Sequence, residues 1–242
     1  MTRGTVGTVP ARPYTIVSCA VSVDGYLDDA SADRLILSGP EDLDEVDALR
    51  AGADAILVGA GTVRADNPRL LVRDAGRVAA REAAGRPPHP RRVTLTAGGD
   101  LDPAARIFTG PGEPLVYATS AAAPAARENL HDKAVVIDVG AELSLAAILT
   151  DLASERLVAT LLVEGGSRIL RDLLAADLAD ELRLAIAPFF VGDERAPRFA
   201  LPATYPHDQR HPMTLLSVRR VGEVAVHHYR LRERFKLRQM PS

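Results

Sequence analysis

Two adjacent glycines stand between a short apolar run and a helical pattern in the segment LLVEGGSRILRDLL, residues 161–174. The run LLV predicts a buried strand, Glu164 stands at its end, and Ser167 takes the position of a helix N-cap. Glycines let the backbone approach a phosphate, and free N–H groups at a helix N-terminus favour negative charge. Gly165, Gly166, Ser167 and Arg168 therefore predict a site for a phosphate-bearing ligand at the C-terminal edge of a mostly parallel sheet. The alternative is a tight strand-to-helix turn with a surface glutamate.

A second glycine-rich segment, GAGTVRADNPRLLVR at residues 59–73, directly follows the apolar run AILV. It looks at first like the dinucleotide-binding pattern GxGxxG, but Arg64 occupies the third glycine position, so that fingerprint fails. What remains is a turn whose backbone and polar side chains can bind a ligand. The residues concerned are Gly59, Gly61, Thr62, Asp66 and Arg73. The alternative is a loop that is capped by its own Asp66 and Asn67.

The histidines and the single cysteine predict neither a metal site nor a nucleophile. His207 and His211 have the spacing of a helical metal pair, but prolines bracket them, so no helix holds that register. His227 and His228 are neighbours on a predicted strand and point to opposite faces. Cys19 lies in an apolar run and is expected to be a core residue. The motifs GxSxG, Walker A and HExxH are absent, which leaves hydrolase and kinase functions without support.

The composition is that of a soluble globular protein, with 242 residues, of which 47% are hydrophobic and 25% charged. A net charge of −3 gives no general attraction to nucleic acid or to acidic membranes. With 4% aromatic residues and no tryptophan, stacking on single-stranded nucleic acid is not expected. No apolar run reaches the roughly 18 residues of a membrane span, and the N-terminal residues lack the apolar core of a signal peptide. We therefore expect a cytoplasmic protein without nucleic-acid or membrane partners.

Strand and helix patterns alternate along the chain and end in an antiparallel pair. Apolar or alternating runs predict strands at residues 14–21, 55–58, 92–96, 114–119, 134–139, 161–163 and 181–187. Helices are predicted over 38–52, with Ser38 near the N-cap, and near 121–129, 143–154 and 167–174. A hairpin around Gly222 closes the chain. These elements predict one α/β domain over residues 13–231 with a mixed, mostly parallel sheet, a loose tail at 1–12 and a solvated tail at 232–242.

Three blocks of the sequence, in this order and spacing, closely resemble the reductase domain family of riboflavin biosynthesis (RibD C-terminal-like), in the dihydrofolate-reductase-like superfamily. The blocks are PYTIVSCAVSVDGYL, ADAILVGAGTVRADNPRLLV and LLVEGGSRILRDLLAADLADELRLAIAPFFVGD. The resemblance covers residues 13–231 and implies a three-layer α/β/α domain that usually forms a homodimer. It implies an NADPH-dependent reductase that converts the ribosylamino group of a 5-amino-6-(5-phosphoribosylamino)pyrimidine to a ribitylamino group.

The resemblance also implies roles for the residues that match the family's motifs. Thr62 and Asp66 match residues that contact the nicotinamide cofactor, and the glycine turn matches the segment that binds its pyrophosphate. The expected cofactor-binding residues are Gly59, Gly61, Thr62, Asp66, Gly165, Gly166, Ser167 and Arg168. Arg50 and Arg73 match positions that hold the substrate and its phosphate, which suits a bidentate guanidinium. The expected substrate-binding residues are Asp24, Ser38, Arg50, Arg73 and Glu164.

The implied reaction is hydride transfer from nicotinamide C4 to C1′ of the opened sugar, in which the cofactor carries the chemistry and the protein orients it. Glu164 and Asp66 are the expected catalytic residues. The zinc-deaminase motif that often precedes this reductase is absent, so we expect a reductase alone. No metal is expected.

Two departures from the family pattern keep alternatives open. Ser18 stands where many relatives carry asparagine or lysine, and AGGD at residues 97–100 replaces side chains that commonly hold the 2′-phosphate of NADPH. Asp100 would repel that phosphate if it faced it, so the residues permit NADH as well as NADPH. One alternative is the same fold and cofactor acting on a pteridine, dihydrofolate or another heterocycle of secondary metabolism. The other is a nucleotide-binding homologue without turnover.

Overall fold

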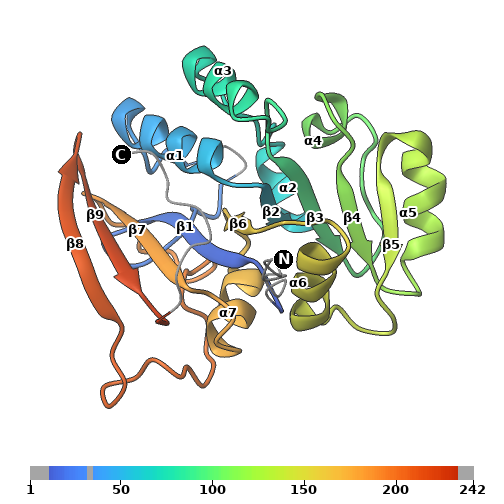
Figure 1. Ribbon diagram of the computed structural model, residues 1–242. Coiled ribbons are helices and arrows are strands. Elements are labelled where there is room, and N and C mark those ends of the chain that lie inside the picture. Colours follow the sequence, from blue (N-terminus) through green and yellow to red (C-terminus); the bar gives the residue numbers. More distant parts are fainter. Residues whose placement is uncertain (1–10, 32–34, 234–242) are drawn as a thin grey trace, which may run out of the picture.

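The computed structural model describes residues 11–31 and 35–233, which form one nine-stranded sheet with helices on both faces (Figure 1). The strands lie in the order β5-β4-β3-β2-β6-β1-β7-β9-β8. Neighbours from β5 to β7 are parallel, whereas β9 runs antiparallel to both β7 and β8. The predicted mixed, mostly parallel sheet with an antiparallel C-terminal hairpin is therefore confirmed. The strands are β1 (Tyr14–Ser22), β2 (Ala55–Gly59), β3 (Arg91–Thr96), β4 (Leu115–Ala118), β5 (Val135–Asp138), β6 (Thr160–Val163), β7 (Glu181–Ala187), β8 (Thr214–Val221) and β9 (Val224–Arg230).

The helices connect the parallel strands and cover the sheet. In the described part of the chain they are α1 (Pro40–Gly52), α2 (Ala60–Asp66), α3 (Ala75–Ala83), α4 (Arg106–Thr109), α5 (Ala123–Leu130), the 3-10 helix η1 (His131–Lys133), α6 (Leu145–Ser154) and α7 (Ser167–Ala175).

The central strands are buried on both faces, which explains why they appear in the sequence as continuous apolar runs. All five residues of β2 are buried. Leu57 belongs to a core cluster that includes Leu149 of α6 and Leu170 of α7. Its neighbour Ile56 belongs to a second cluster, on the other face, that includes Val63 of α2. The expected three-layer α/β/α arrangement is confirmed.

Strand β6 lies between β1 and β2, although it comes much later in the chain. Because the three strands are parallel, their carboxyl ends meet at one edge of the sheet. Ligands of open α/β sheets bind at this edge, close to the point where the strand order reverses. Both glycine-rich segments begin there, since Gly59 ends β2 and Gly165 lies two residues beyond β6. The topology therefore brings together two segments that are far apart in the sequence.

The structure corrects three details of the local predictions. The segment expected as a glycine-rich turn after β2 is helical at once, as α2, because Ala60 and Val63 pack into the core and stabilise a helix whose intrinsic propensity is low. The N-cap of α7 is Gly166 and not Ser167, because the chain turns into the helix through a positive φ of 95°. The N-cap of α1 is Gly39, one residue after Ser38, and no side chain caps it.

A buried ion pair fastens the start of β1 to the start of β7. The Asp180 carboxylate is fully buried and accepts hydrogen bonds from both terminal nitrogens of Arg12, at 2.6 and 2.9 Å, and from the Thr15 N–H at 2.8 Å. Buried contacts of the domain thus begin at Arg12, within the predicted N-terminal tail. Residues 1–10 and 234–242 of the two predicted tails lie outside the described residues.

Replacing Asp180 with alanine should destabilise the fold strongly. It would leave the buried Arg12 guanidinium without its carboxylate, a change that costs about 3–5 kcal/mol of unfolding free energy. Urea denaturation measures this loss. Asp172→Ala is the matched control, because Asp172 forms an exposed pair with Arg171 and its loss should not change the midpoint measurably. Equal midpoints for the two variants would contradict the assignment.

Candidate active site

The two glycine-rich segments are in contact at the carboxyl edge of the sheet. The N–H of Glu164 donates to the carbonyl of Leu57 at 3.1 Å, so the chain beyond β6 continues alongside β2. A Cβ placed on Gly166 would lie 3.4 Å from Thr62 Oγ1 and 3.7 Å from the Gly59 nitrogen. The site therefore has a cradle of bare backbone, built from both segments, that a side chain at position 166 would begin to fill.

The backbone of the turn before α7 requires glycine. Gly165 and Gly166 have φ values of +143° and +95°, in a region that other L-residues rarely adopt. This conformation starts α7 without a side-chain cap, so the N–H groups of its first turn can serve a ligand. Ser167 is half-buried in that first turn, whereas Arg168 is exposed. The structure thus places the four predicted residues of this segment around one helix N-terminus.

Helix α2 carries the predicted residues of the other segment. Thr62 and Asp66 are four residues apart on a helix, so they share one face, and both are half-buried. Gly61 is exposed and has open space where a Cβ would point. Arg64, which breaks the dinucleotide fingerprint, donates from Nη1 to the carbonyl of Asp100 at 3.0 Å. This contact brings a guanidinium to the loop after β3, which the sequence pattern alone did not indicate.

Arg50 and Glu164, both predicted to bind substrate, form a bidentate ion pair. Arg50 Nε lies 2.7 Å from Glu164 Oε1, and Arg50 Nη2 lies 2.6 Å from Oε2. The side chains are only 18% and 10% exposed, so the pair is shielded from water. Burial by itself would lower the pKa of Arg50, but the charge and hydrogen bonds of Glu164 raise it above its usual value. The pair thus holds a permanently charged guanidinium beside the glycine turn, on the last turn of α1.

The segment between α2 and α3 follows the same edge. Asn67 ends α2 in a left-handed conformation, and its side-chain oxygen accepts from the Arg106 N–H at 2.7 Å. Leu70 is buried at a positive φ of 54°, and the next residue, Leu71, accepts a hydrogen bond from Arg50 Nη1 at 3.3 Å. Arg73 is largely exposed, and its Nη2 donates to the carbonyl of Leu43 in α1 at 2.8 Å.

Asp24 braces the loop that follows β7. Its carboxylate accepts from the Ser22 hydroxyl at 2.5 Å and from the N–H groups of Val191 and Gly192 at 3.1 and 2.8 Å. Loss of solvent around the carboxylate would raise its pKa, but these hydrogen bonds outweigh that effect and lower it. Ser38 is half-buried two residues before α1 begins. Among the residues that the structure describes, Asp24 therefore makes a bracing contact and Ser38 makes no comparable one.

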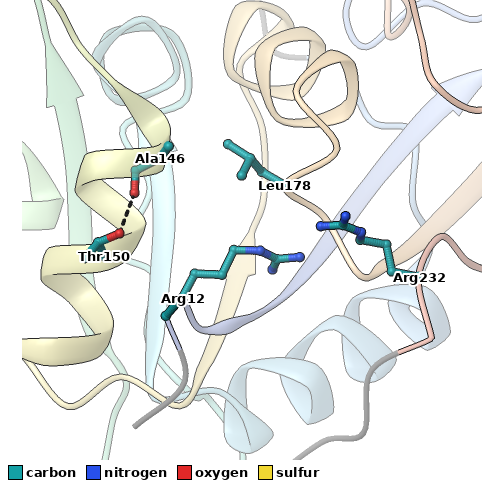
Figure 2. Close-up of a pocket in the computed structure, with 6 residues that line it drawn as sticks. Arg12, Ala146, Thr150, Leu178 and Arg232 are labelled. Carbon is teal, nitrogen blue, oxygen red and sulfur yellow. Dashed lines mark hydrogen bonds between the residues drawn. The ribbon is translucent and has the colours of Figure 1, made fainter.

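A groove of about 390 Å³ lies at the opposite edge of the sheet, before the starts of β1 and β7. Figure 2 shows the guanidinium groups of Arg12 and Arg232 pointing toward the same space, below Leu178. Arg12 is bound to Asp180, and Arg232 lies 3.0 Å from Asp177. Both guanidinium groups are paired with carboxylates, whereas the first turn of α7 has no side-chain cap, so we expect the glycine edge to be the stronger anion site.

Neither a metal-binding cluster nor a membrane-spanning helix is found among the residues that the structure describes. Among residues 11–31 and 35–233, no three His, Cys, Asp or Glu side chains are grouped so that they could hold a metal ion. Within the same ranges, no helix has the length and apolar character needed to cross a membrane.

The fold and this edge define an α/β domain in which two glycine-rich segments meet beside a mostly buried ion pair. The model of the RibD C-terminal domain matches residues 13–226, and the chain belongs to that family. It is 38% identical over 186 residues to the 2,5-diamino-6-ribosylamino-4(3H)-pyrimidinone 5′-phosphate reductase of Archaeoglobus fulgidus, covering 77% of this chain and 85% of the relative. The reductase of the same name from Aquifex aeolicus is 35% identical over 192 residues, covering 77% and 81%.

Solved structures show the same fold. A pyrimidine reductase-like protein from Corynebacterium diphtheriae superposes with a TM-score of 0.77 at 23% identity, covering 90% of this chain and 91% of that one. RibD of Acinetobacter baumannii superposes with a TM-score of 0.75 at 24% identity, covering 91% of this chain. This chain spans 58% of the length of the Acinetobacter protein. The predicted family and the predicted fold class are both confirmed.

The Arg50–Glu164 pair should contribute measurably to stability. Glu164→Gln keeps the size of the side chain but removes the charge that faces a mostly buried guanidinium, which should cost about 1.5–3 kcal/mol of unfolding free energy. Chemical denaturation at neutral pH measures the change. Glu223→Gln is the control, since the Arg220–Glu223 pair is almost fully exposed and should contribute nothing measurable. If Glu164→Gln unfolded at the wild-type midpoint, the pair would have no structural role.

Proposed function

We propose that this protein is an NADPH-dependent reductase that converts the ribosylamino group of a 5-amino-6-(5-phosphoribosylamino)pyrimidine to a ribitylamino group. The observation that carries the proposal is the contact between the two glycine segments, directly beside the Arg50–Glu164 pair. This edge of the sheet thus offers backbone N–H groups for one phosphate-bearing molecule and a guanidinium for another. The names of the Archaeoglobus and Aquifex relatives, which are reductases of a ribosylaminopyrimidinone 5′-phosphate, support this substrate class.

The residues at the edge fit a nicotinamide dinucleotide. Its pyrophosphate would lie against Gly165, Gly166 and the first turn of α7, where backbone N–H groups and the helix dipole favour negative charge. The cradle that a Cβ on Gly166 would enter is the structural feature that fits this group. The other residues proposed to hold the cofactor surround this cradle or follow it on α2 and α7, and they are Gly59, Gly61, Thr62, Asp66, Ser167 and Arg168.

NADPH is the proposed form of the cofactor. The loop at residues 97–100 has no basic side chain, but Arg64 donates to the Asp100 carbonyl and places a positive charge beside that loop. The Arg50–Glu164 pair, proposed to bind the substrate, lies on the α1 side of the glycine turn. The adenosine end of the cofactor would therefore extend in the other direction, past β2 toward β3. A 2′-phosphate on that ribose would be attracted by Arg64. Asp100 opposes this attraction, so the preference over NADH should be modest.

The substrate end of the site is proposed to lie around Arg50, Arg73 and Glu164. Guanidinium groups bind phosphate bidentately, and both arginines lie at the face of α1 that meets the loop before α3. Asp24 would act on the substrate cleft through the loop that it braces, and Ser38 is proposed as a contact before α1.

When bound, the cofactor supplies the hydride that reduces C1′ of the opened sugar. The protein's contribution is to orient the two molecules and to shield them from water. Glu164 and Asp66 are the proposed catalytic carboxylates. Both oxygens of Glu164 are engaged by Arg50, so its proposed role is to hold the Arg50 guanidinium at the substrate.

Oxidation of NADPH in the presence of the pyrimidine phosphate tests the function. We expect loss of NADPH absorbance with the diamino or the deaminated pyrimidine, and slower loss with NADH. Turnover only with a pteridine or dihydrofolate would overturn the substrate, and cofactor binding without turnover on any heterocycle would overturn the enzymatic function.

Gly166→Ala should weaken cofactor binding by at least about tenfold, because the new Cβ would occupy the space beside Thr62 and Gly59 where the pyrophosphate is proposed to lie. Gly140→Ala is the matched control: Gly140 has a similar φ of +92°, but open space surrounds the position. Both changes place a side chain at a positive φ that L-residues rarely adopt. Fluorescence titration with NADPH distinguishes them, and equal affinities for the two variants would refute the cofactor site.

A homodimer formed through the outer strand β8 is also proposed. In the described residues β8 pairs with β9 alone, and it forms the outer edge of the sheet (Figure 1). A bulge between Leu215 and Ser217 sets Leu215 and Val218 opposite Tyr229 and His227, so both point to one face. They are 54% and 53% exposed, which is unusual for aliphatic side chains side by side on an outer strand.

The proposed location is the cytoplasm, where phosphorylated substrates and NADPH are retained by their charge.

Light scattering should show a dimer for the wild type and a monomer when Leu215 and Val218 are both changed to serine. Serine removes the apolar area that an interface between copies would bury. Leu157→Ser is the control, because Leu157 is 76% exposed and precedes β6, away from β8. A wild-type monomer at micromolar concentration, or a dimer that survives both substitutions, would overturn this interface.

A further inference from the structure

Helix α1 contains an acid that is almost completely buried. Asp47 is 2% exposed, and it lies one turn before Arg50 on the same helix. A buried carboxylate is costly unless it is hydrogen-bonded and its charge is balanced. The contacts of Asp47 therefore indicate what the residue is for.

Asp47 accepts hydrogen bonds from two consecutive backbone N–H groups. Oδ1 lies 2.6 Å from the Arg73 nitrogen, and Oδ2 lies 3.1 Å from the Asp74 nitrogen. Arg77 Nη1 also donates to Oδ2 at 3.2 Å, and Arg73 Nε lies 3.7 Å from Oδ1. A carboxylate presents one acceptor oxygen to each of the two N–H groups, whereas an asparagine would turn an NH2 donor toward one of them.

The same face of α1 makes two more contacts with this segment. The Leu43 carbonyl accepts from Arg73 Nη2 at 2.8 Å, and Arg50 Nη1 donates to the Leu71 carbonyl at 3.3 Å. Positions 43, 47 and 50 are spaced by four and three residues, so they form one stripe along the helix. Asp47 stands in the middle of that stripe and is the member that binds the backbone of Arg73 itself. Arg50 and Arg73 are thus positioned relative to a single rigid element.

We propose that Asp47 is a positioning residue that holds Arg73 at a set distance from Arg50, so that both guanidinium groups can engage one substrate phosphate. This rests on the proposed function, which assigns the phosphate to these two arginines. Asp47 acts through the Arg73 backbone and does not touch the phosphate. Its removal should therefore affect molecules that carry the phosphate and leave the cofactor site unchanged.

Asp47→Asn is the test, and Asp44→Asn is the matched control. Asp44 lies on the same helix and binds Arg77 at 2.7 and 2.8 Å, but it is 65% exposed and bonds Arg77 rather than the Arg73 backbone. With Asp47→Asn we expect KM for the pyrimidine 5′-phosphate to rise at least about tenfold, because charge-assisted contacts to the phosphate are lost. KM for NADPH and kcat at saturation should stay near the wild-type values, and Asp44→Asn should match the wild type throughout.

The dephosphorylated pyrimidine nucleoside separates positioning from a general structural role. Wild type and Asp47→Asn should turn it over at the same rate, because the phosphate contacts that Asp47 positions are then unused. A loss of equal size with both substrates, or a rise in KM for NADPH, would overturn the proposal. If Asp47→Asn does not fold, judged by circular dichroism, Asp47→Glu takes its place, because it keeps the charge but shifts the carboxylate by one methylene.

Failure of the proposed function would be seen separately, as wild-type protein that does not oxidise NADPH with the pyrimidine phosphate. Calorimetric titration with ribose 5-phosphate then decides the role of Asp47 without turnover. The proposal requires binding by the wild type and Asp44→Asn and at least about tenfold weaker binding by Asp47→Asn. Equal affinity in all three proteins, or no binding by the wild type, would overturn it.

Discussion

The ion pair between Arg50 and Glu164 joins two layers of the molecule at the point where the central strands end. Glu164 belongs to the chain that leaves β6, and Arg50 belongs to the last turn of α1. Since β6 lies between β1 and β2, this contact fixes α1 against the middle of the sheet and not against its rim. The pair thus links the glycine turn to the face of α1, and the Leu71 carbonyl that Arg50 also binds links both to the loop before α3.

Helix α1 is attached to the rest of the protein through charged contacts more than through an apolar face. Its buried residues are Asp42 and Asp47, and Asp42 pairs with Arg183 of β7 in the interior. Glu45, on the same helix, binds Arg219 of β8 at 2.7 Å. Ion pairs and hydrogen bonds depend on direction, whereas an apolar face tolerates sliding and repacking. A helix that must present a guanidinium in one orientation gains from contacts of this kind.

The strands could be predicted from sequence because burial on both faces leaves a strong local signal. The apolar runs of β1, β2 and β7 and the hairpin around Gly222 lie where predicted. The prediction of a cap at Ser167 was wrong because the backbone of Gly166 decides where α7 starts. The prediction of a turn after Gly59 was wrong because α2 follows β2 directly. The pairing of Arg50 with Glu164 could not be predicted from local patterns, since it depends on the insertion of β6. Asp47 was missed because an acid within an amphipathic pattern is normally a surface residue; its position one turn from Arg50 was the available signal.

The position of β6 also has a consequence for the order in which the chain can fold. Tyr14 in β1 pairs with Thr160, and Ile16 pairs with Glu181, so the first strand to leave the ribosome finds its neighbours only in the second half of the chain. Strands β2 to β5, by contrast, pair with their sequence neighbours and can assemble as they are made. Closing such a long loop is slow and costs chain entropy before any contact compensates. The edge where β1, β6 and β2 meet is therefore expected to form late in folding, because it needs both halves of the chain.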